Sequence, residues 1–179
     1  RYPKDLCERP EMLQKAYASG VPMGGDIAGS PSQQSSPRLL VAALADPASD
    51  AVPLQKLQVI KGWIDANGKA HNKVYDVAGD AQSAAGVDMK TGKRYGKGHS
   101  NLCTVFEDPE FNPQETAYYY LRAVENPSPR WSLLDCISYS EAERPNVCDS
   151  PKISAVIQEQ AWTSPIWYTP ASSLAKNAN

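Results

Sequence analysis

The sequence predicts a mainly β protein: an antiparallel β-sandwich, immunoglobulin-like or similar, with one short N-terminal helix and long loops. Composition is the first observation, because 15 prolines and 11 glycines beside only 2 phenylalanines in 179 residues favour short elements joined by fixed turns. Periodicity is the second, since roughly six or seven segments with strand-like alternation follow one another with turn residues between them. Long helices are therefore not expected.

The first element is the helix, which is expected over residues 10–20. Pro10 suits the first turn of a helix, and Gly20 suits its end. Leu13, Ala16 and Tyr17 fall on one helical face. This short segment is the only strong helix signal in the chain.

The strands that follow are expected at residues 39–45, 57–64, 70–77, 102–107, 117–125 and 160–168. The first is a continuous apolar run that ends at Asp46-Pro47, which predicts a buried central strand. Residues 65–68 (Asp-Ala-Asn-Gly) predict a hairpin turn between the second and third, with Gly68 supplying positive φ. Residues 79–100 are glycine-rich and are expected to form a long loop. Pro165 confines the last, aromatic strand to a sheet edge or a bulge.

In strand 117–125, alternation places Tyr118, Tyr120 and Arg122 on one face and Tyr119 and Leu121 on the other. The domain organisation follows from these elements. We expect an N-terminal arm over residues 1–37, a β-sandwich domain over 38–170 and a disordered tail over 171–179. The chain begins at Arg1 without an initiator methionine, and we expect a mature, processed or fragmentary species.

The net charge of −2 gives no electrostatic reason to expect nucleic acid as a partner. No apolar run approaches the roughly 18–20 residues that a membrane-spanning helix needs, so no transmembrane segment is predicted.

Four cysteines, Cys7, Cys103, Cys136 and Cys148, allow three pairings. Cys136 and Cys148 enclose a polar loop, so a local bridge between them is natural, and Cys7 with Cys103 would then tie the arm to a strand. The alternative is four reduced, buried thiols in a cytosolic protein. Two disulfides would instead indicate an oxidising compartment, which is periplasmic or extracellular.

Zinc is a poor interpretation of these cysteines. None lies in a Cys-x-x-Cys pair, and His71 and His99 are the only histidines. No metal site and no catalytic residue is predicted in this chain.

Several motifs resemble, in the same order, the C-terminal part of bacterial proteins grouped as domain of unknown function 3604. The motifs lie at residues 20–26, 74–80, 125–127, 130–132 and 161–168, and the resemblance runs from about residue 1 to 170. Members of that family are typically long, exported proteins related to the polymerase-and-histidinol-phosphatase (PHP) metallohydrolases.

The resemblance implies a parent protein whose divalent-metal ligands, beginning with an Asp-Leu-His-x-His type motif, lie in its N-terminal part. This chain has no His-x-His sequence. A PHP-type site needs several imidazoles and carboxylates that converge on two or three metal ions, which two isolated histidines cannot supply. The parent therefore looks hydrolase-related, whereas no cofactor is expected in this chain.

The densest polar and aromatic cluster consists of Arg122, Glu125, Asn126, Arg130 and Trp131. An arginine with a tryptophan could bind a carboxylate, a phosphate or a sugar ring. The alternative is that Arg122 packs over aromatic faces and pairs with a nearby acid.

Asp26 is the remaining candidate ligand-binding residue. With Gly24 and Gly25 it could form a backbone anion-binding nest beside a carboxylate that projects into a neighbouring active site. The alternative, which we favour, is an ordinary turn.

The first functional hypothesis is a non-catalytic accessory domain that flanks a metallohydrolase domain, or a processed subunit docked on a larger extracytoplasmic assembly. The expected partner is another protein or that N-terminal domain, and the aromatics available for docking are Trp131, Trp162, Trp167, Tyr118 and Tyr120. The second hypothesis is the C-terminal half of a PHP-type phosphoesterase that contributes residues such as Asp26 to the parent's active site. The third is a carbohydrate-binding module.

Overall fold

The computed structural model describes residues 2–30, 32 and 35–171 and shows a mainly β fold. The helical elements are η1 (Leu6–Glu8), α1 (Met12–Ser19), α2 (Trp131–Ser138) and η2 (Asn146–Asp149). The strands are β1 (Asp26–Ala28), β2 (Arg38–Leu44), β3 (Leu54–Ile64), β4 (Ala70–Gly79), β5 (Gly86–Val87), β6 (Arg94–Tyr95), β7 (Asn101–Glu107), β8 (Ala117–Glu125), β9 (Ser128–Pro129), β10 (Val156–Ile157), β11 (Gln160–Trp162) and β12 (Ile166–Thr169).

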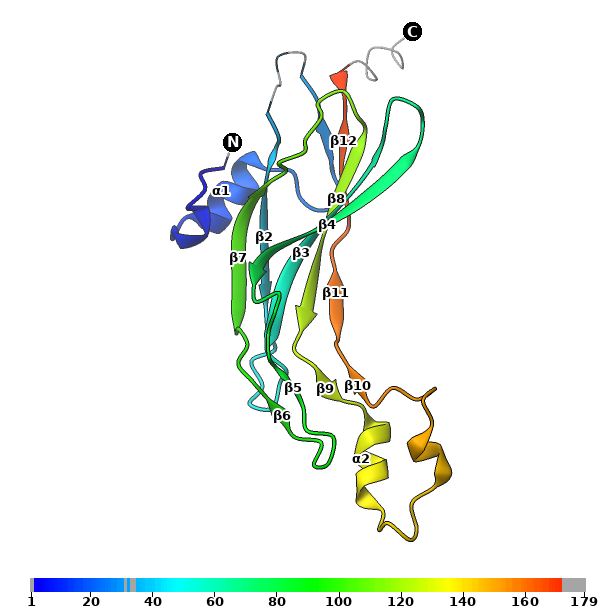
Figure 1. Cartoon of the computed structure of the whole chain (residues 1–179). Coiled ribbons are helices and arrows are strands. Elements are labelled where there is room, and N and C mark those ends of the chain that lie inside the picture. Colours follow the sequence, from blue (N-terminus) through cyan, green and yellow to red (C-terminus); the bar gives the residue numbers. More distant parts are fainter. Residues whose placement is uncertain (1, 31, 33–34, 172–179) are drawn as a thin grey trace.

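Two layers of strands form the body of the molecule (Figure 1). The main sheet has six strands in the order β1-β12-β8-β3-β4, with β11 also paired to β8. Strands β2 and β7 form a second, two-stranded sheet. All of these neighbours are antiparallel except β1 and β12. The expected antiparallel, sandwich-like β architecture is therefore confirmed.

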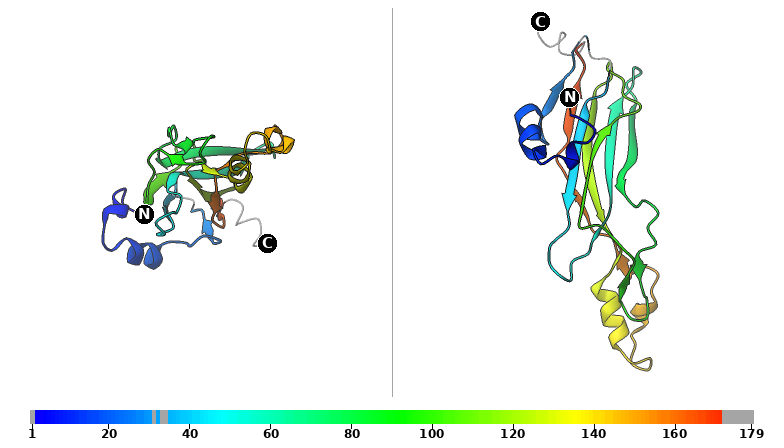
Figure 2. Two further views of the ribbon diagram at one scale, coloured as in Figure 1. Left: turned by 90° about the horizontal axis from the view of Figure 1, so that it is seen from below. Right: turned by 90° about the vertical axis from the view of Figure 1, so that its left-hand side faces the viewer.

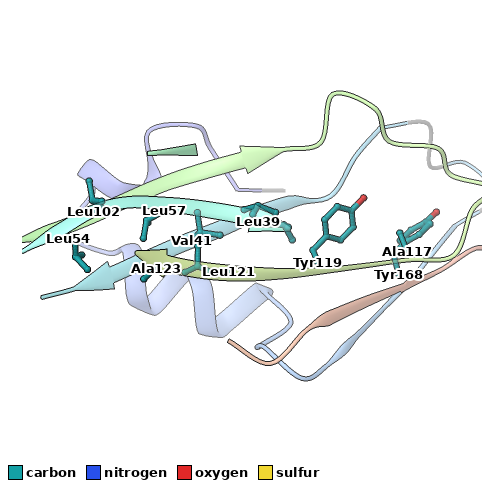
Figure 3. Packing of buried hydrophobic residues seen from close by; sticks show 11 residues of the cluster. Leu39, Val41, Leu54, Leu57, Leu102, Ala117, Tyr119, Leu121, Ala123 and Tyr168 are labelled. Carbon is teal, nitrogen blue, oxygen red and sulfur yellow. The ribbon is translucent and has the colours of Figure 1, made fainter. Parts of the chain in front are cut away.

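The core lies between the two layers (Figure 3). Leu39 and Val41 of β2 and Leu102 of β7 pack against the inner face of β3 and β8. The register places Val59 opposite Leu121, so inward side chains of adjacent strands form continuous apolar rows. The buried members of the cluster are Leu39, Val41, Leu54, Leu57, Val59, Leu102, Ala117, Tyr119, Leu121, Ala123 and Tyr168.

A buried ion pair interrupts the apolar inner face. Lys61 Nζ lies 2.6 Å from Asp108 Oδ2, and the two side chains are 3% and 1% exposed. The Tyr119 hydroxyl donates to the same carboxylate at 2.8 Å and the Tyr75 hydroxyl at 3.2 Å. Lys61 also donates to the carbonyl of Glu110 at 2.8 Å. The ion pair therefore ties β3 and β8 to the loop that follows β7.

Both predicted disulfides are confirmed. Cys7–Cys103 joins η1 to β7, with Cα atoms 5.9 Å apart, and Cys136–Cys148 joins α2 to η2, with Cα atoms 5.6 Å apart. The expected arm, residues 1–37, is also joined to the main sheet by β1, which pairs with β12.

The hairpin prediction is confirmed, because β3 and β4 pair around a turn in which Gly68 has φ 78° and its N–H donates to the carbonyl of Asp65. One other expectation was wrong, and the structure adds detail to two more. The apolar run at residues 39–45 forms β2, which pairs only with β7 among the described residues, so it is an edge strand and not a central one. The predicted loop at 79–100 contains the short β5–β6 hairpin. The expected bulge at Pro165 is present and divides the aromatic segment into β11 and β12, because three residues separate Trp162 from Ile166 while two separate their partners Arg122 and Tyr119. The other side of β12 pairs with β1.

A second α-helix was not predicted. Helix α2 lies in a small lobe beyond the ends of the main strands (Figure 2). Its Leu133 is buried, and Leu134 and Ile137 pack close to Gly92 of the loop between β5 and β6. Tertiary packing and the Cys136–Cys148 bridge therefore stabilise a helix whose eight residues carry only a weak local signal. Apart from Ala171, the predicted tail lies outside the described residues. No helix in the described chain has the length and apolar character needed to cross a bilayer.

Candidate functional site

The outer surface of the main sheet carries a cluster of aromatic side chains that we call the aromatic face: Tyr118, Tyr120, Trp162 and Trp167, with Arg122. The predicted alternation along β8 is confirmed, because Tyr119 and Leu121 are buried in the core while Tyr118, Tyr120 and Arg122 lie on the opposite side. Trp167 of β12 is opposite Tyr118, and Trp162 of β11 is opposite Arg122. The register of three strands thus brings these side chains to one surface.

The aromatic rings are in mutual contact. Tyr118 and Tyr120 are stacked, with centroids 6.3 Å apart and planes 16° apart. Tyr118 also contacts Trp167, with centroids 5.2 Å apart. Trp162 and Trp167 remain 59% and 43% exposed. Large apolar rings gathered at this exposure are typical of a binding surface and unusual for a solvated one.

Gly62 of β3 gives Tyr118 its place on the sheet. The two residues are opposite each other in register, and a Cβ on Gly62 would overlap the Tyr118 ring and hydroxyl. The ring therefore lies flat across the glycine.

We expect Gly62→Ala to swing the Tyr118 ring off the sheet with little loss of stability, because the overlapping atoms belong to the far end of a mobile side chain. Near-ultraviolet circular dichroism should change clearly, while the free energy of unfolding falls by roughly 1 kcal/mol or less. The same substitution in a Tyr118→Ala background should have almost no spectral effect. An equal effect in both backgrounds would contradict this account of the aromatic face.

A row of polar side chains borders the aromatic rings. Arg122 Nε donates to Gln58 Oε1 at 2.8 Å, and Gln58 Nε2 donates to Asp76 Oδ1 at 2.7 Å. Lys56 Nζ lies 3.2 Å from the same carboxylate oxygen. Arg122 is therefore held by hydrogen bonds across β8, β3 and β4, and neither Gln58 nor Asp76 was among the predicted site residues.

Asp26 is the second predicted site residue that the structure places at this surface. It begins β1 and is in register with Trp167, so it borders the aromatic face. Its neighbours do not form an anion-binding nest. The N–H of Gly24 donates to the carbonyl of Pro165 and that of Gly25 to the carbonyl of Pro22, so both donors are occupied.

Glu125 and Asn126 lie beyond the aromatic face, where β8 ends. Asn126 is buried and its Nδ2 donates to the carbonyl of Lys97 at 3.0 Å, which ties the preceding loop to β8. Burial raises the pKa of the Glu125 carboxyl, with Glu159 adding to the effect. Packing at the end of the sheet accounts for the Glu125 carboxyl, whereas Asn126 Oδ1 is buried without a hydrogen-bond partner among the described residues.

Arg130 and Trp131 lie further away, at the start of α2 in the small lobe. Trp131 is 72% exposed. The structure therefore separates these two residues from Arg122, although they are close in sequence.

The two histidines do not converge. His71 stacks on Trp63, with centroids 5.2 Å apart, and its Nε2 is 2.8 Å from Asp65 Oδ2, whereas His99 pairs through its backbone with Leu54. The hydrogen bond from His71 lowers the pKa of Asp65. Within the part of the chain that the structure describes, no three His, Cys, Asp or Glu side chains are grouped to hold a metal ion.

The aromatic face therefore combines exposed rings for stacking with the ordered guanidinium of Arg122 and the bordering carboxylate of Asp26. These groups are typical of a binding site. The class of protein that the fold and this surface define is a disulfide-bonded, two-layer β domain with an exposed aromatic sheet face. The model of the family described as "Protein of unknown function (DUF3604)" matches residues 1–170, and the chain belongs to that family. No curated protein and no solved structure matches it.

Proposed function

We propose that this chain is a non-catalytic interaction domain of an exported, metal-dependent-hydrolase-related protein, and that the aromatic face docks it on a protein partner. The partner of first choice is the N-terminal, metallohydrolase-like region that the family resemblance implies. The observation that carries the proposal is the exposure of Trp162 and Trp167 beside two stacked tyrosines on a sheet face.

The chemistry of the surface supports protein docking. Tryptophan, tyrosine and arginine are the residues most enriched at the energetic centres of protein interfaces. Arg122 is already oriented by Gln58, so little side-chain entropy is lost when a partner binds it. Docking on the N-terminal region would bury the rings.

The disulfides support an exported location. Bonds such as Cys7–Cys103 and Cys136–Cys148 persist in the periplasm or outside the cell and are rare in the reducing cytosol.

A second candidate function is that the chain completes the active site of the parent phosphoesterase. The position of Asp26 favours it, because this exposed carboxylate borders the surface proposed to dock and has no side-chain hydrogen bond or ion pair with any described residue. Asp26→Asn would then lower phosphoesterase turnover in the full-length protein while leaving docking unchanged.

The test of docking measures binding between this chain and the separately produced N-terminal region by calorimetry. We expect Trp162→Ala together with Trp167→Ala to weaken binding by at least about 30-fold, because buried interface tryptophans are usual hot spots. Trp131→Ala is the matched control, since it removes a more exposed tryptophan outside the aromatic face and should leave binding unchanged.

Four outcomes would contradict the proposal. Binding could be insensitive to both tryptophans of the face, or equally sensitive to Trp131. The isolated chain could hydrolyse phosphoesters with added divalent metal. Finally, binding of the aromatic face to glycans in place of protein would favour the carbohydrate-binding alternative.

A further inference from the structure

The second layer of the sandwich is narrower than the first, and the difference leaves a groove. The main sheet has six strands, whereas β2 and β7 form a sheet of two. In the part of the chain that the structure describes, the second layer has no strand beyond β2 to cover the inner face of β8. A groove of about 870 Å³ lies here, between β2, α1 and the inner side of β8 and β12.

The free edge of β2 forms one wall of this groove. The N–H of Ala45 donates to the carbonyl of Ser100, which makes this a hydrogen-bonded pair of the β2–β7 ladder. Because such pairs alternate, the N–H and C=O groups of Leu40, Ala42 and Leu44 point away from β7. Among the described residues, none of these backbone groups has a hydrogen-bond partner in another element.

This edge lacks the features that normally protect edge strands. After Arg38, β2 contains only Leu, Val and Ala, with no charge, proline or bulge, and Leu44 is 82% exposed. By contrast, β4, which is an edge strand of the main sheet, carries Lys73 and Asp76 and has a register shift against β3. A long, apolar and unprotected edge is a template for another strand.

The groove beside the edge is apolar on each side. Its floor includes Val59 and Leu121, and α1 contributes Leu13 and Tyr17, which are 62% and 82% exposed. A strand added to β2 would have the sheet on one side and α1 on the other. Its inserted side chains would therefore be apolar on both faces.

The groove carries almost no unpaired charge, which favours an uncharged occupant. Arg38 is the only ionic side chain among the described residues that line it. Its guanidinium is already neutralised, with Nε 3.2 Å from Glu107 Oε2. A charged residue inserted here would be buried without a counter-ion, so complementarity selects a neutral segment.

From these observations we infer that the β2 groove is a strand-acceptor site: it binds an extended, uncharged, apolar segment of a partner protein, which pairs with the free N–H and C=O groups of Leu40, Ala42 and Leu44. The segment completes the second layer of the sandwich. This site lies on the layer opposite the aromatic face and does not depend on the docking proposed above.

The test uses a synthetic peptide of six alternating valine and alanine residues with lysines and a fluorophore at its ends, and measures fluorescence anisotropy with the intact chain. We expect saturable binding. The same peptide N-methylated at alternate residues should bind at least about tenfold more weakly, because it loses the ladder hydrogen bonds while it keeps its side chains.

A variant of the chain tests the same edge. Ala42→Pro removes an N–H that points to the free edge and leaves the β2–β7 ladder intact, so the fold should be retained and peptide binding lost. Trp162→Ala with Trp167→Ala should not change peptide binding, which separates this site from the aromatic face.

Two results would overturn the inference. One is that the unmethylated and N-methylated peptides bind with equal affinity. The other is that the groove binds the small apolar dye anilinonaphthalene sulfonate, with no change in Ala42→Pro, while the peptide does not bind. The groove would then be a small-molecule pocket.

Discussion

Replacing Asp108 by asparagine is expected to lower the free energy of unfolding by about 3–5 kcal/mol, because it leaves the ammonium of Lys61 buried without its counter-ion. The side chain of Lys61 is 3% exposed, so water cannot take the place of the carboxylate. Chemical denaturation of the variant and of the unsubstituted chain measures the difference in the free energy of unfolding.

Two controls separate the buried pair from charge in general. Asp149→Asn removes the partner of Arg144 from a pair whose aspartate is 76% exposed, and this loss should stay below about 1 kcal/mol. Lys61→Met added to Asp108→Asn removes the unpaired charge and should restore part of the lost stability. A double variant as unstable as the sum of the two single ones would show that the pair is not coupled.

The same carboxylate gives stability a pH dependence. Burial acts to raise the pKa of Asp108, but the hydrogen bonds from Lys61 and Tyr119 outweigh it and hold the pKa below its ordinary value. A lowered folded-state pKa stabilises the fold above the unfolded-state value of about 4, and this contribution is lost as the pH falls through the folded-state value. The acid-induced loss of stability should therefore be smaller in Asp108→Asn than in the unsubstituted chain.

Local periodicity was sufficient to predict the faces of the long strands. Alternation along β8 correctly separated Tyr118 and Tyr120 from Tyr119 and Leu121, since side chains of a strand alternate whatever its partners are. The turn at Gly68 was also predictable, because its chemistry is local.

Pairing between distant segments was not predictable in the same way. An apolar run such as β2 is equally suited to a central strand and to an edge strand beside a hydrophobic groove, and only the partner distinguishes them. Its partner β7 lies about 60 residues later in the chain. Helix α2 was missed for a related reason, since its support comes from the packing of Leu134 and Ile137 near Gly92 and from a disulfide.

The candidate site likewise combines features that are local in the sequence with features that depend on strand pairing. Arg122 was identified from its own strand, whereas Gln58 and Asp76 join it only through the register of β3 and β4. Lys61 left a signal that could have been used: it alternates in phase with Leu57 and Val59, which are both buried. A lysine in phase with a core row needs a buried acid, and Asp108 is the residue that directly follows β7.

Removing the Cys7–Cys103 disulfide is expected to cost more stability than removing Cys136–Cys148. The first joins residues 96 apart in sequence and the second joins residues 12 apart. In the chain-entropy account, a loop of about 100 residues is worth about 4.7 kcal/mol and one of about 15 residues about 3 kcal/mol. Paired substitutions, Cys7→Ala with Cys103→Ala and Cys136→Ala with Cys148→Ala, allow the comparison without leaving a free thiol.

The two bridges also hold different parts of the molecule, so their loss should be distinguishable by where the chain opens. Without Cys7–Cys103, the fully buried Leu6 still holds η1 in place, and amide exchange should rise in the arm and along β2 and β7. Without Cys136–Cys148, faster amide exchange should be confined to α2 and η2, and the amides of β8 should stay as protected as in the unsubstituted chain. If both paired variants lose the same stability and open the same segments, loop length does not govern the contribution of these bonds, and strain or residual structure in the unfolded chain must decide it instead.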